Sequence, residues 1–138
     1  MDTTDDEIVI RSPNANDANF ILATWLRGLY YGCEWFHQVP KHIFMEEYHK
    51  ILVALLSSPN TTTRMACLRD DQDVIVGYSV TSTGDTALHW IFVKTGWRKL
   101  CVAKRLVPNS ITSVSHLTKV GLDILRKYPD LVFNPFRN

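Results

Sequence analysis

The chain has 138 residues, of which 46% are hydrophobic and 21% are charged, and its formal net charge is +1. This length favours a single domain over residues 1–138, which can bury a core without disulfides or metals. A net charge this small provides no global field of the kind that draws proteins to nucleic acid or to membrane surfaces.

The cysteine pattern and the N-terminus favour a cytoplasmic protein. The cysteines, Cys33, Cys67 and Cys101, are too widely spaced for a zinc site or a disulfide framework, which favours a reducing compartment. The N-terminus is acidic where a signal peptide would be basic, and the apolar run at 51–56 is too short to cross a bilayer. We therefore expect no membrane partner and a disordered segment at 1–6. The oligomeric state stays open, a homodimer included.

The first half of the chain predicts one strand and two helices. Residues 7–11 carry consecutive apolar side chains and are followed by Ser12-Pro13, which suits a short strand. Asp17 is placed to cap a helix that begins near Ala18. Pro40 suits the first turn of a second helix, whose apolar residues keep helical spacing up to 57–59.

From residue 60 the hydrophobic period changes to two. Residues 63–69, 74–81 and 86–94 are predicted to be strands joined by short turns, which favours antiparallel pairing. A basic turn, a short helix ended by Pro108, and further elements follow; these are a strand at 111–117, a helix at 119–128 and a strand at 131–133. The order β-α-α-β-β-β-α-β-α-β indicates an α/β (α+β) fold with a mixed, largely antiparallel central sheet flanked by helices.

The basic turn at 97–104 has the chemistry of an anion site. Arg98 and Lys99 stand where a helix is predicted to begin, and the free N–H groups and the dipole of a helix start favour negative charge. The small side chains of Cys101 and Ala103 let a phosphate approach the backbone. A solvated basic turn beside an ordinary helix is the simpler alternative.

The order of the elements and the residues at 98–103 together resemble the GCN5-related N-acetyltransferase (GNAT) superfamily. That family transfers acyl groups from acyl-CoA to amines, and it carries an Arg/Gln-x-x-Gly-x-Gly/Ala signature after its fourth strand. This chain resembles a divergent member, because Cys101 replaces a signature glycine and Pro108 shortens the following helix. The tyrosine that commonly serves as general acid in the family would be replaced by Leu125.

The resemblance implies acetyl-CoA, or another acyl-CoA, as cosubstrate. The strand at 91–93 would pair with the pantetheine arm, an N–H near Val93 would polarise the thioester carbonyl, and the basic turn would hold the pyrophosphate. The residues that would bind the cofactor are Phe92, Val93, Arg98, Lys99, Leu100, Cys101, Val102, Ala103 and Lys104.

Three side chains are candidates for proton transfer. His116 or His89 would accept the proton of the amine, directly or through water, and Tyr128 would protonate the thiolate. A hydrogen-bonded histidine within a sheet is the plainer interpretation of either histidine. No metal is expected, because a solvated helix face explains the spacing of His42, Glu46 and His49 more simply than a metal site does.

The acceptor side is less defined. The aromatic cluster at 28–36 either shapes an acceptor pocket or covers the core, and Glu34 would lie at the mouth of that pocket. The predicted function is acyl-CoA-dependent N-acyltransfer, with acetyl transfer to a primary amine of a small molecule or protein by direct attack on the thioester. The alternative, suggested by Cys101 and Leu125, is a catalytically silent binding or inhibitory module with the same fold. Nucleic-acid binding by the basic patch is less favoured, because a local anion site explains that patch better.

Overall fold

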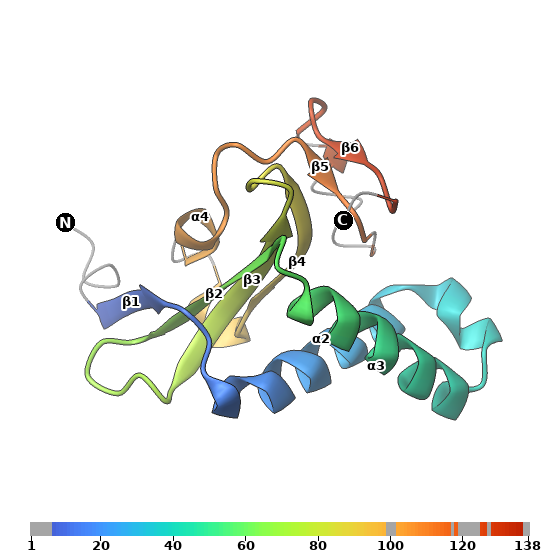
Figure 1. The fold of residues 1–138 in the computed structure, drawn as a ribbon, viewed down its shortest axis with the longest axis horizontal. Helices are drawn as coiled ribbons and strands as arrows, with labels where there is room; N and C mark the ends of the chain where they lie inside the picture. Colours follow the sequence, from blue (N-terminus) through green and yellow to red (C-terminus); the bar gives the residue numbers. More distant parts are fainter. Residues whose placement is uncertain (1–6, 99–101, 117, 119–124, 127, 137–138) are drawn as a thin grey trace.

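One six-stranded sheet organises the domain in the computed structural model, which describes residues 7–98, 102–116, 118, 125–126 and 128–136. The strands lie side by side in chain order (Figure 1). They are β1 (Ile8–Arg11), β2 (Thr61–Leu68), β3 (Ile75–Ser82), β4 (Ala87–Val93), β5 (Ser113–Val114) and β6 (Val132–Phe133). The helices are η1 (Ala15–Asp17), α2 (Ala18–Gly32), η2 (Glu34–Gln38), α3 (Lys41–Ser57), η3 (Thr95–Trp97) and α4 (Val102–Leu106).

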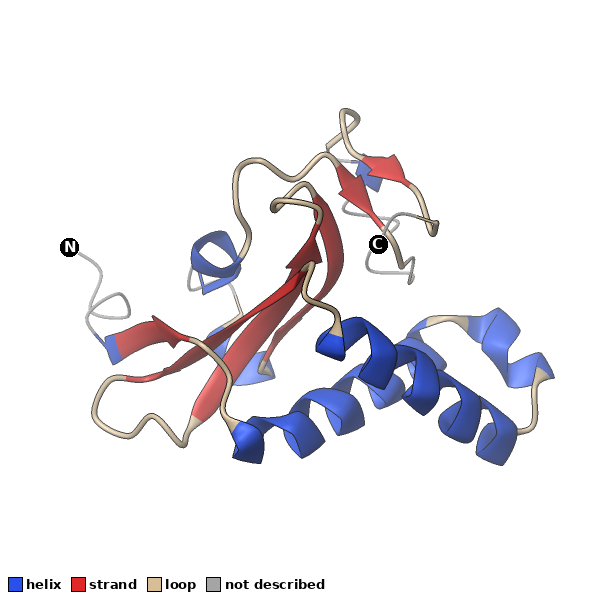
Figure 2. Ribbon diagram, viewed as in Figure 1, coloured by secondary structure: helices blue, strands red, loops and turns tan. Residues whose placement is uncertain are grey.

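The pairing confirms a mixed, largely antiparallel sheet. The pairs among β1, β2, β3 and β4 are antiparallel, whereas β5 is parallel to both β4 and β6. The long helices α2 and α3 lie on one face of the sheet and the short α4 on the other (Figure 2). No helix in the described part of the chain is long and apolar enough to cross a membrane.

The start of α2 differs from the prediction that Asp17 caps it. Asn14 is the capping residue of the 3-10 turn η1, and its side chain accepts a hydrogen bond from the N–H of Asn16 at 3.0 Å. The carboxylate of Asp17 accepts from the N–H of Asn14 at 2.8 Å and pairs with Arg11 at 2.6 Å. Because η1 runs directly into α2, Asp17 already has helical backbone angles and closes a capping box instead.

The main core lies between the sheet and the two long helices. Its buried residues come from α2, α3, β2 and β3, and they include Ile21, Trp25, Leu29, Phe44, Leu52, Met65, Tyr78 and Val80. The hydroxyl of Tyr78 donates to the carbonyl of Ile21 at 3.0 Å and lies 2.7 Å from Oγ1 of Thr24. This contact ties α2 to β3, so the position of α2 over the sheet is defined by packing and by hydrogen bonds.

A second, smaller core holds α4 against the opposite face. Val102 and Leu106 of α4 pack on Ile8, Ala66 and Val76 of the sheet. The helix ends close to Pro108, as the sequence predicts. This position places α4, which contains the last residues of the basic turn, next to β4.

The C-terminal region departs most from the predicted boundaries. The strand predicted at 111–117 pairs only over Ser113–Val114, because the chain then turns to bring Ser115 and His116 against β4. Most of the helix predicted at 119–128 lies outside the described residues; Leu125 and Arg126 are helical and Tyr128 is not. The predicted final strand is present as β6. Residues 1–6, which the sequence predicts to be disordered, lie outside the described residues.

Candidate functional site

The parallel strands β4 and β5 pair only where β4 begins. Ala87 is opposite Ser113 and Leu88 is opposite Val114, and no described strand continues that pairing along the rest of β4. A cleft of about 1120 Å³ opens beyond this point, between α2, β4 and the segment that follows β5. Its lining residues include Arg27, Gly28, Tyr31, Trp90, Phe92, Val93, His116, Thr118 and Leu125. The exposed edge of a strand along one wall offers backbone groups to a ligand.

Two glycines of α2 allow the helix to approach the cleft walls. A Cβ atom at Gly28 would lie 2.8 Å from Cζ2 of Trp90, and one at Gly32 would lie 3.1 Å from Cγ2 of Thr118. Trp90 stacks on Trp25 of α2, with ring centroids 5.6 Å apart. The floor of the cleft is therefore a close-packed layer of indole rings and bare backbone.

His116 lines the cleft and is half-buried among aromatic rings. Its ring centroid lies 5.6 Å from that of Trp25, 6.1 Å from that of Tyr48 and 6.4 Å from that of Trp90. Burial, and secondly the neighbouring His89, lowers the pKa of His116 to about 4. The imidazole is therefore neutral at neutral pH and has a lone pair to accept a proton.

His89 lies deeper than His116 and is hydrogen-bonded at both ring nitrogens. It occupies a β-bulge, because Val80 pairs with Trp90 and Thr81 with Leu88, which leaves His89 without an opposite residue. Its side chain is 3% exposed, and burial lowers its pKa. His89 is thus a hydrogen-bonded histidine within the sheet, which is the plainer of the two interpretations from the sequence. It also contributes to the wall of the cleft.

A smaller pocket of about 400 Å³ adjoins the cleft at the end of β4. It is lined by Val93, Trp97, Arg98, Val102, Ala103, Lys104 and Tyr128. Val93, Arg98 and Ala103 line both hollows, so the cleft and the pocket are continuous. Nε of Arg98 donates to the carbonyl of Val93 at 3.0 Å, which holds this guanidinium at the junction.

The basic patch of the sequence divides into two groups in the structure. Arg98 and Lys104 face the smaller pocket. Lys94 instead lies over the ring of Phe20, with Nζ 5.6 Å from the centroid, and Arg105 donates to the carbonyl of Ile8 at 3.0 Å. A local anion site fits this division better than a continuous basic surface would.

The structure brings together all of the predicted cofactor residues that it describes. Phe92, Val93, Arg98, Val102, Ala103 and Lys104 line the cleft or the smaller pocket. Lys99, Leu100 and Cys101 lie outside the described residues. Tyr128 is 59% exposed and lines the smaller pocket, whereas Leu125 lines the cleft that contains His116.

The aromatic cluster divides between the cleft and the core. Tyr31 lines the cleft, and its hydroxyl accepts a hydrogen bond from Nζ of Lys41 at 2.9 Å. Tyr30 and Phe36 pack on the core, and Trp35 is exposed.

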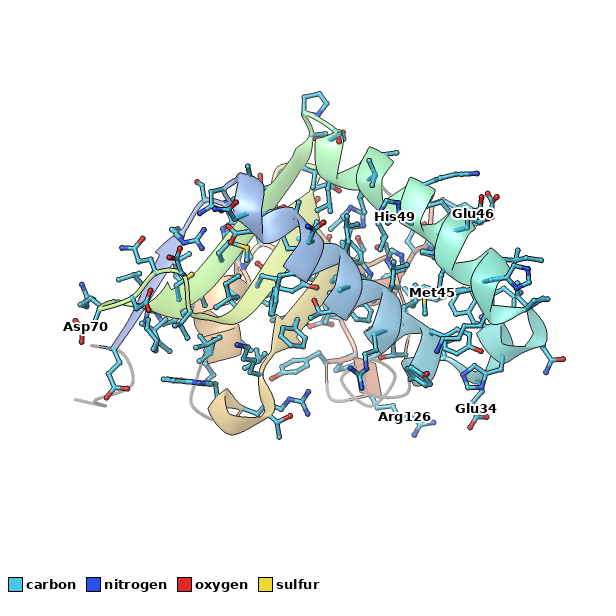
Figure 3. All side chains as sticks on the ribbon, turned by 90° about the horizontal axis from the view of Figure 1, so that it is seen from below. Glu34, Met45, Glu46, His49, Asp70 and Arg126 are labelled. Carbon is cyan, nitrogen blue, oxygen red and sulfur yellow. The ribbon has the colours of Figure 1, made fainter. Side chains whose placement is uncertain are left out.

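The helix face considered for a metal is solvated. His42, Glu46 and His49 are all exposed on α3, where Figure 3 labels the last two. Within the described part of the chain, no group of three potential ligand side chains is close enough to hold a metal ion. Glu34 belongs to η2 and is not among the residues that line the cleft.

Sequence reasoning missed the serines that surround His89. Oγ of Ser115 lies 2.6 Å from Nδ1 of His89 and 2.8 Å from Nδ1 of His116, and Oγ of Ser82 lies 2.6 Å from Nε2 of His89. The sequence did contain a sign of these serines, because Ser82 and Ser115 each place a hydroxyl group within or next to a predicted strand that carries apolar residues. Their connection to the histidines depends on strand pairing, which no local pattern reveals.

Known structures share the fold, although no family model matches the chain and no curated protein matches its sequence. A possible acetyltransferase from Clostridium difficile 630 is similar with a TM-score of 0.53 and 12% identity, over 89% of this chain and 88% of that one. A GNAT-family acetyltransferase from Staphylococcus aureus Mu50 has a TM-score of 0.47 and 22% identity, and the match covers 72% of this chain and 60% of that one. The present chain therefore spans less than two thirds of the Staphylococcus protein.

A third structure, AAC(6')-Iy in complex with a bisubstrate analog of CoA, has a TM-score of 0.48 and 16% identity, over 95% of this chain and 93% of that one. These likenesses concern the fold. The chain has a mixed α+β architecture, which it shares with the possible acetyltransferase from Clostridium difficile 630.

Proposed function

We propose that this chain is an acyl-CoA-dependent N-acyltransferase that transfers an acetyl group to a primary amine of a small molecule or protein in the cytoplasm. The observation that carries the proposal is the divergence of β4 from β5. It opens a cleft that contains a histidine and continues into a pocket with two cationic side chains. A cosubstrate with a thioester at one end and phosphates at the other suits this layout.

The cofactor would lie along the free edge of β4. Amide groups of the pantetheine arm would pair with backbone near Phe92 and Val93, as an added strand pairs with a sheet edge. Arg98 and Lys104 would bind the phosphates by charge-assisted hydrogen bonds. Lys99, Leu100, Cys101 and Val102 keep the cofactor role that the resemblance implies for them.

The amine would enter between α2 and the segment after β5 and attack the thioester carbonyl. The C–N bond forms, an N–H near Val93 stabilises the oxyanion, and the C–S bond then breaks. His116 accepts the proton that the amine loses, with His89 behind it. Tyr128, at the rim of the smaller pocket, is the candidate to protonate the thiolate.

Acetyl-CoA binding tests the proposal and its cofactor site. Because a ligand that binds only the folded state stabilises it, acetyl-CoA should raise the melting temperature in a concentration-dependent way. Arg98→Ala should weaken this binding about tenfold or more, since it removes a phosphate partner. Lys50→Ala is the matched control, because Lys50 is an exposed cation on α3 that lines neither hollow.

A panel of primary amines then separates enzyme from silent module. Release of free CoA with any amine supports the acyltransferase. A melting shift with acetyl-CoA but no CoA release across the panel would favour the silent binding module. No shift with any acyl-CoA would contradict both.

A further inference from the structure

A chain of four hydrogen-bonded side chains leads from the cleft into the sheet. It begins at His116, passes through Ser115 and His89, and ends at Ser82, with separations of 2.8, 2.6 and 2.6 Å. Ser82, His89 and Ser115 are buried, whereas His116 is open to the cleft. These side chains come from β3, β4 and the end of β5, where three strands meet.

Ser115 limits the hydrogen-bonding roles of the two imidazoles. A serine hydroxyl has one proton to donate and two lone pairs, and Oγ of Ser115 is shared by Nδ1 of His116 and Nδ1 of His89. At most one ring can therefore accept a hydrogen bond from Ser115, and the other ring must donate its Nδ1–H. When Ser115 donates to His89, a neutral His116 donates its Nδ1–H and has a lone pair on Nε2; when Ser115 donates to His116, the proton of a neutral His116 lies on Nε2 instead.

We propose that His89, Ser115 and His116 form a proton relay for the acyl transfer. At rest, Nδ1–H of His116 donates to Ser115, and Ser115 donates to Nδ1 of His89. Nε2 of His116, on the opposite edge of the ring, then accepts the proton of the attacking amine. The role of the relay rests on the proposed function, whereas the resting arrangement of protons does not.

The proton count closes along this path. One proton enters at Nε2 of His116, the proton on its Nδ1 passes to Oγ of Ser115, and the former hydroxyl proton of Ser115 passes to Nδ1 of His89. The positive charge then lies on His89, whose two N–H groups donate to Ser115 and Ser82. The reverse path returns the proton, and no oxidant or further reactant is involved.

The surroundings of His116 favour transfer of the positive charge from His116 to His89. The titratable groups whose rings contact it are Tyr48 of α3 and His89 of β4. Burial raises the pKa of Tyr48, so neither neighbour is an anion at neutral pH. Burial is the main cause that disfavours an imidazolium at His116, and a hydrogen bond with the backbone of His89 offsets it only in part. An imidazolium at His89 has a hydroxyl oxygen at each ring nitrogen.

Nitrogen NMR of the ¹⁵N-labelled full chain tests the resting arrangement directly. At pH 7.5, long-range proton–nitrogen spectra should show the Nδ1–H tautomer for His116 and the Nε2–H tautomer for His89. Ser115→Ala should convert His116 to the Nε2–H tautomer, whereas Ser115→Thr, which keeps the hydroxyl, should not. Ser79→Ala is the matched control, because Ser79 is a buried serine of β3 that donates to the carbonyl of Leu106.

An Nε2–H tautomer for His116 in the unmodified chain, or no change in Ser115→Ala, would overturn the relay. The kinetic arm uses the amine of the panel that gives the fastest CoA release. His89→Gln should lower kcat at least tenfold with little change in KM for acetyl-CoA, since the proposed cofactor-binding residues of β4 and the basic turn are unchanged. An unchanged kcat in that variant would also overturn the relay.

The failure of the proposed function has a different signature from the failure of the relay. If acetyl-CoA neither shifts the melting temperature nor is consumed, the acyltransferase proposal fails, whatever the tautomers are. If acetyl-CoA is consumed and the tautomers are reversed, the function stands and the relay fails.

Discussion

At the scale of single residues, the environment of His116 suits a neutral base. The residue is half-buried, contacts the rings of Trp25 and Tyr48, and is bonded to Ser115 through one nitrogen. A pKa lowered to about 4 means that His116 is almost entirely the neutral imidazole before the amine binds. The same low pKa makes the imidazolium form of His116 unstable, so His89 would serve as a second acceptor that takes the proton from it.

Replacement of His116 should affect turnover more than cofactor binding. We expect His116→Gln to lower kcat by roughly 10²–10⁴, the usual contribution of a general base, while the melting shift with acetyl-CoA is preserved. CoA release under saturating acetyl-CoA measures the loss. His49→Gln, an exposed histidine on α3, is the control and should retain full activity. Equal rates for both variants would remove His116 from the mechanism.

At the scale of elements, the path of β4 decides where the site can form. β4 is bonded to β3 along its length but to β5 only at its start, so no strand among the described residues pairs with its second half on that side. Gly77 of β3 lies opposite Val93, and a Cβ atom there would be 2.5 Å from the carbonyl oxygen of Phe92. The close approach of these two strands therefore depends on a missing side chain.

Gly77→Ala should both destabilise the domain and distort β4 at Phe92 and Val93, where the cofactor is proposed to bind. The added methyl meets a backbone oxygen that cannot rotate away, so we expect a loss of about 1–3 kcal/mol in the free energy of unfolding. Gly96→Ala in η3 is the control, because a Cβ atom there meets nothing within 4 Å and it should change stability little. Urea unfolding of both variants measures the difference, and similar stabilities would show that β3 and β4 can separate at no cost.

At the scale of the whole molecule, the lowered pKa values of the buried histidines and of two ion-paired carboxylates make acid destabilising. The pKa of His116 falls from an ordinary 6.5 to about 4 on folding, so the unfolded chain binds its proton first as pH drops. This contribution is fully present above pH 6.5 and is lost as pH falls toward 4. The pKa values of Asp17 and Asp85 are lowered chiefly by hydrogen bonds from Arg11 and Arg64, so their contributions are lost only at still lower pH.

The free energy of unfolding should therefore decrease by roughly 2 kcal/mol between pH 8 and pH 5, mainly through His116. The further decrease below pH 4 belongs to the two ion-paired carboxylates. Urea unfolding at pH 8 and pH 5 measures the first step, and His116→Gln should make it smaller. An equal free energy at both pH values in the unmodified chain would contradict the buried, neutral histidine.

The local pattern of the sequence was sufficient for the fold class and for the order of the strands and of the helices up to α4. Alternating residues in 60–94 and helical spacing in α2 and α3 are properties of each segment alone, because one face of each is apolar. The same reasoning placed Arg98 after the end of β4, where the chain must leave the sheet. Boundaries were less predictable. Asp17 belongs to a capping box formed with Asn14 instead of capping α2 itself, and β5 is defined by its pairing with the distant β4.

Local sequence patterns thus define the strands, the helices up to α4 and a basic turn after the fourth strand. The three-dimensional fold was needed to show that β5 leaves β4 after Leu88, that the cleft begins there, and that His116 lies within it. It also decided which cations face the pocket and which hydroxyls join the histidines. The physical reason is that hydrophobic periodicity reports which face of a segment is buried, whereas hydrogen bonds between distant residues depend on the pairing of the strands.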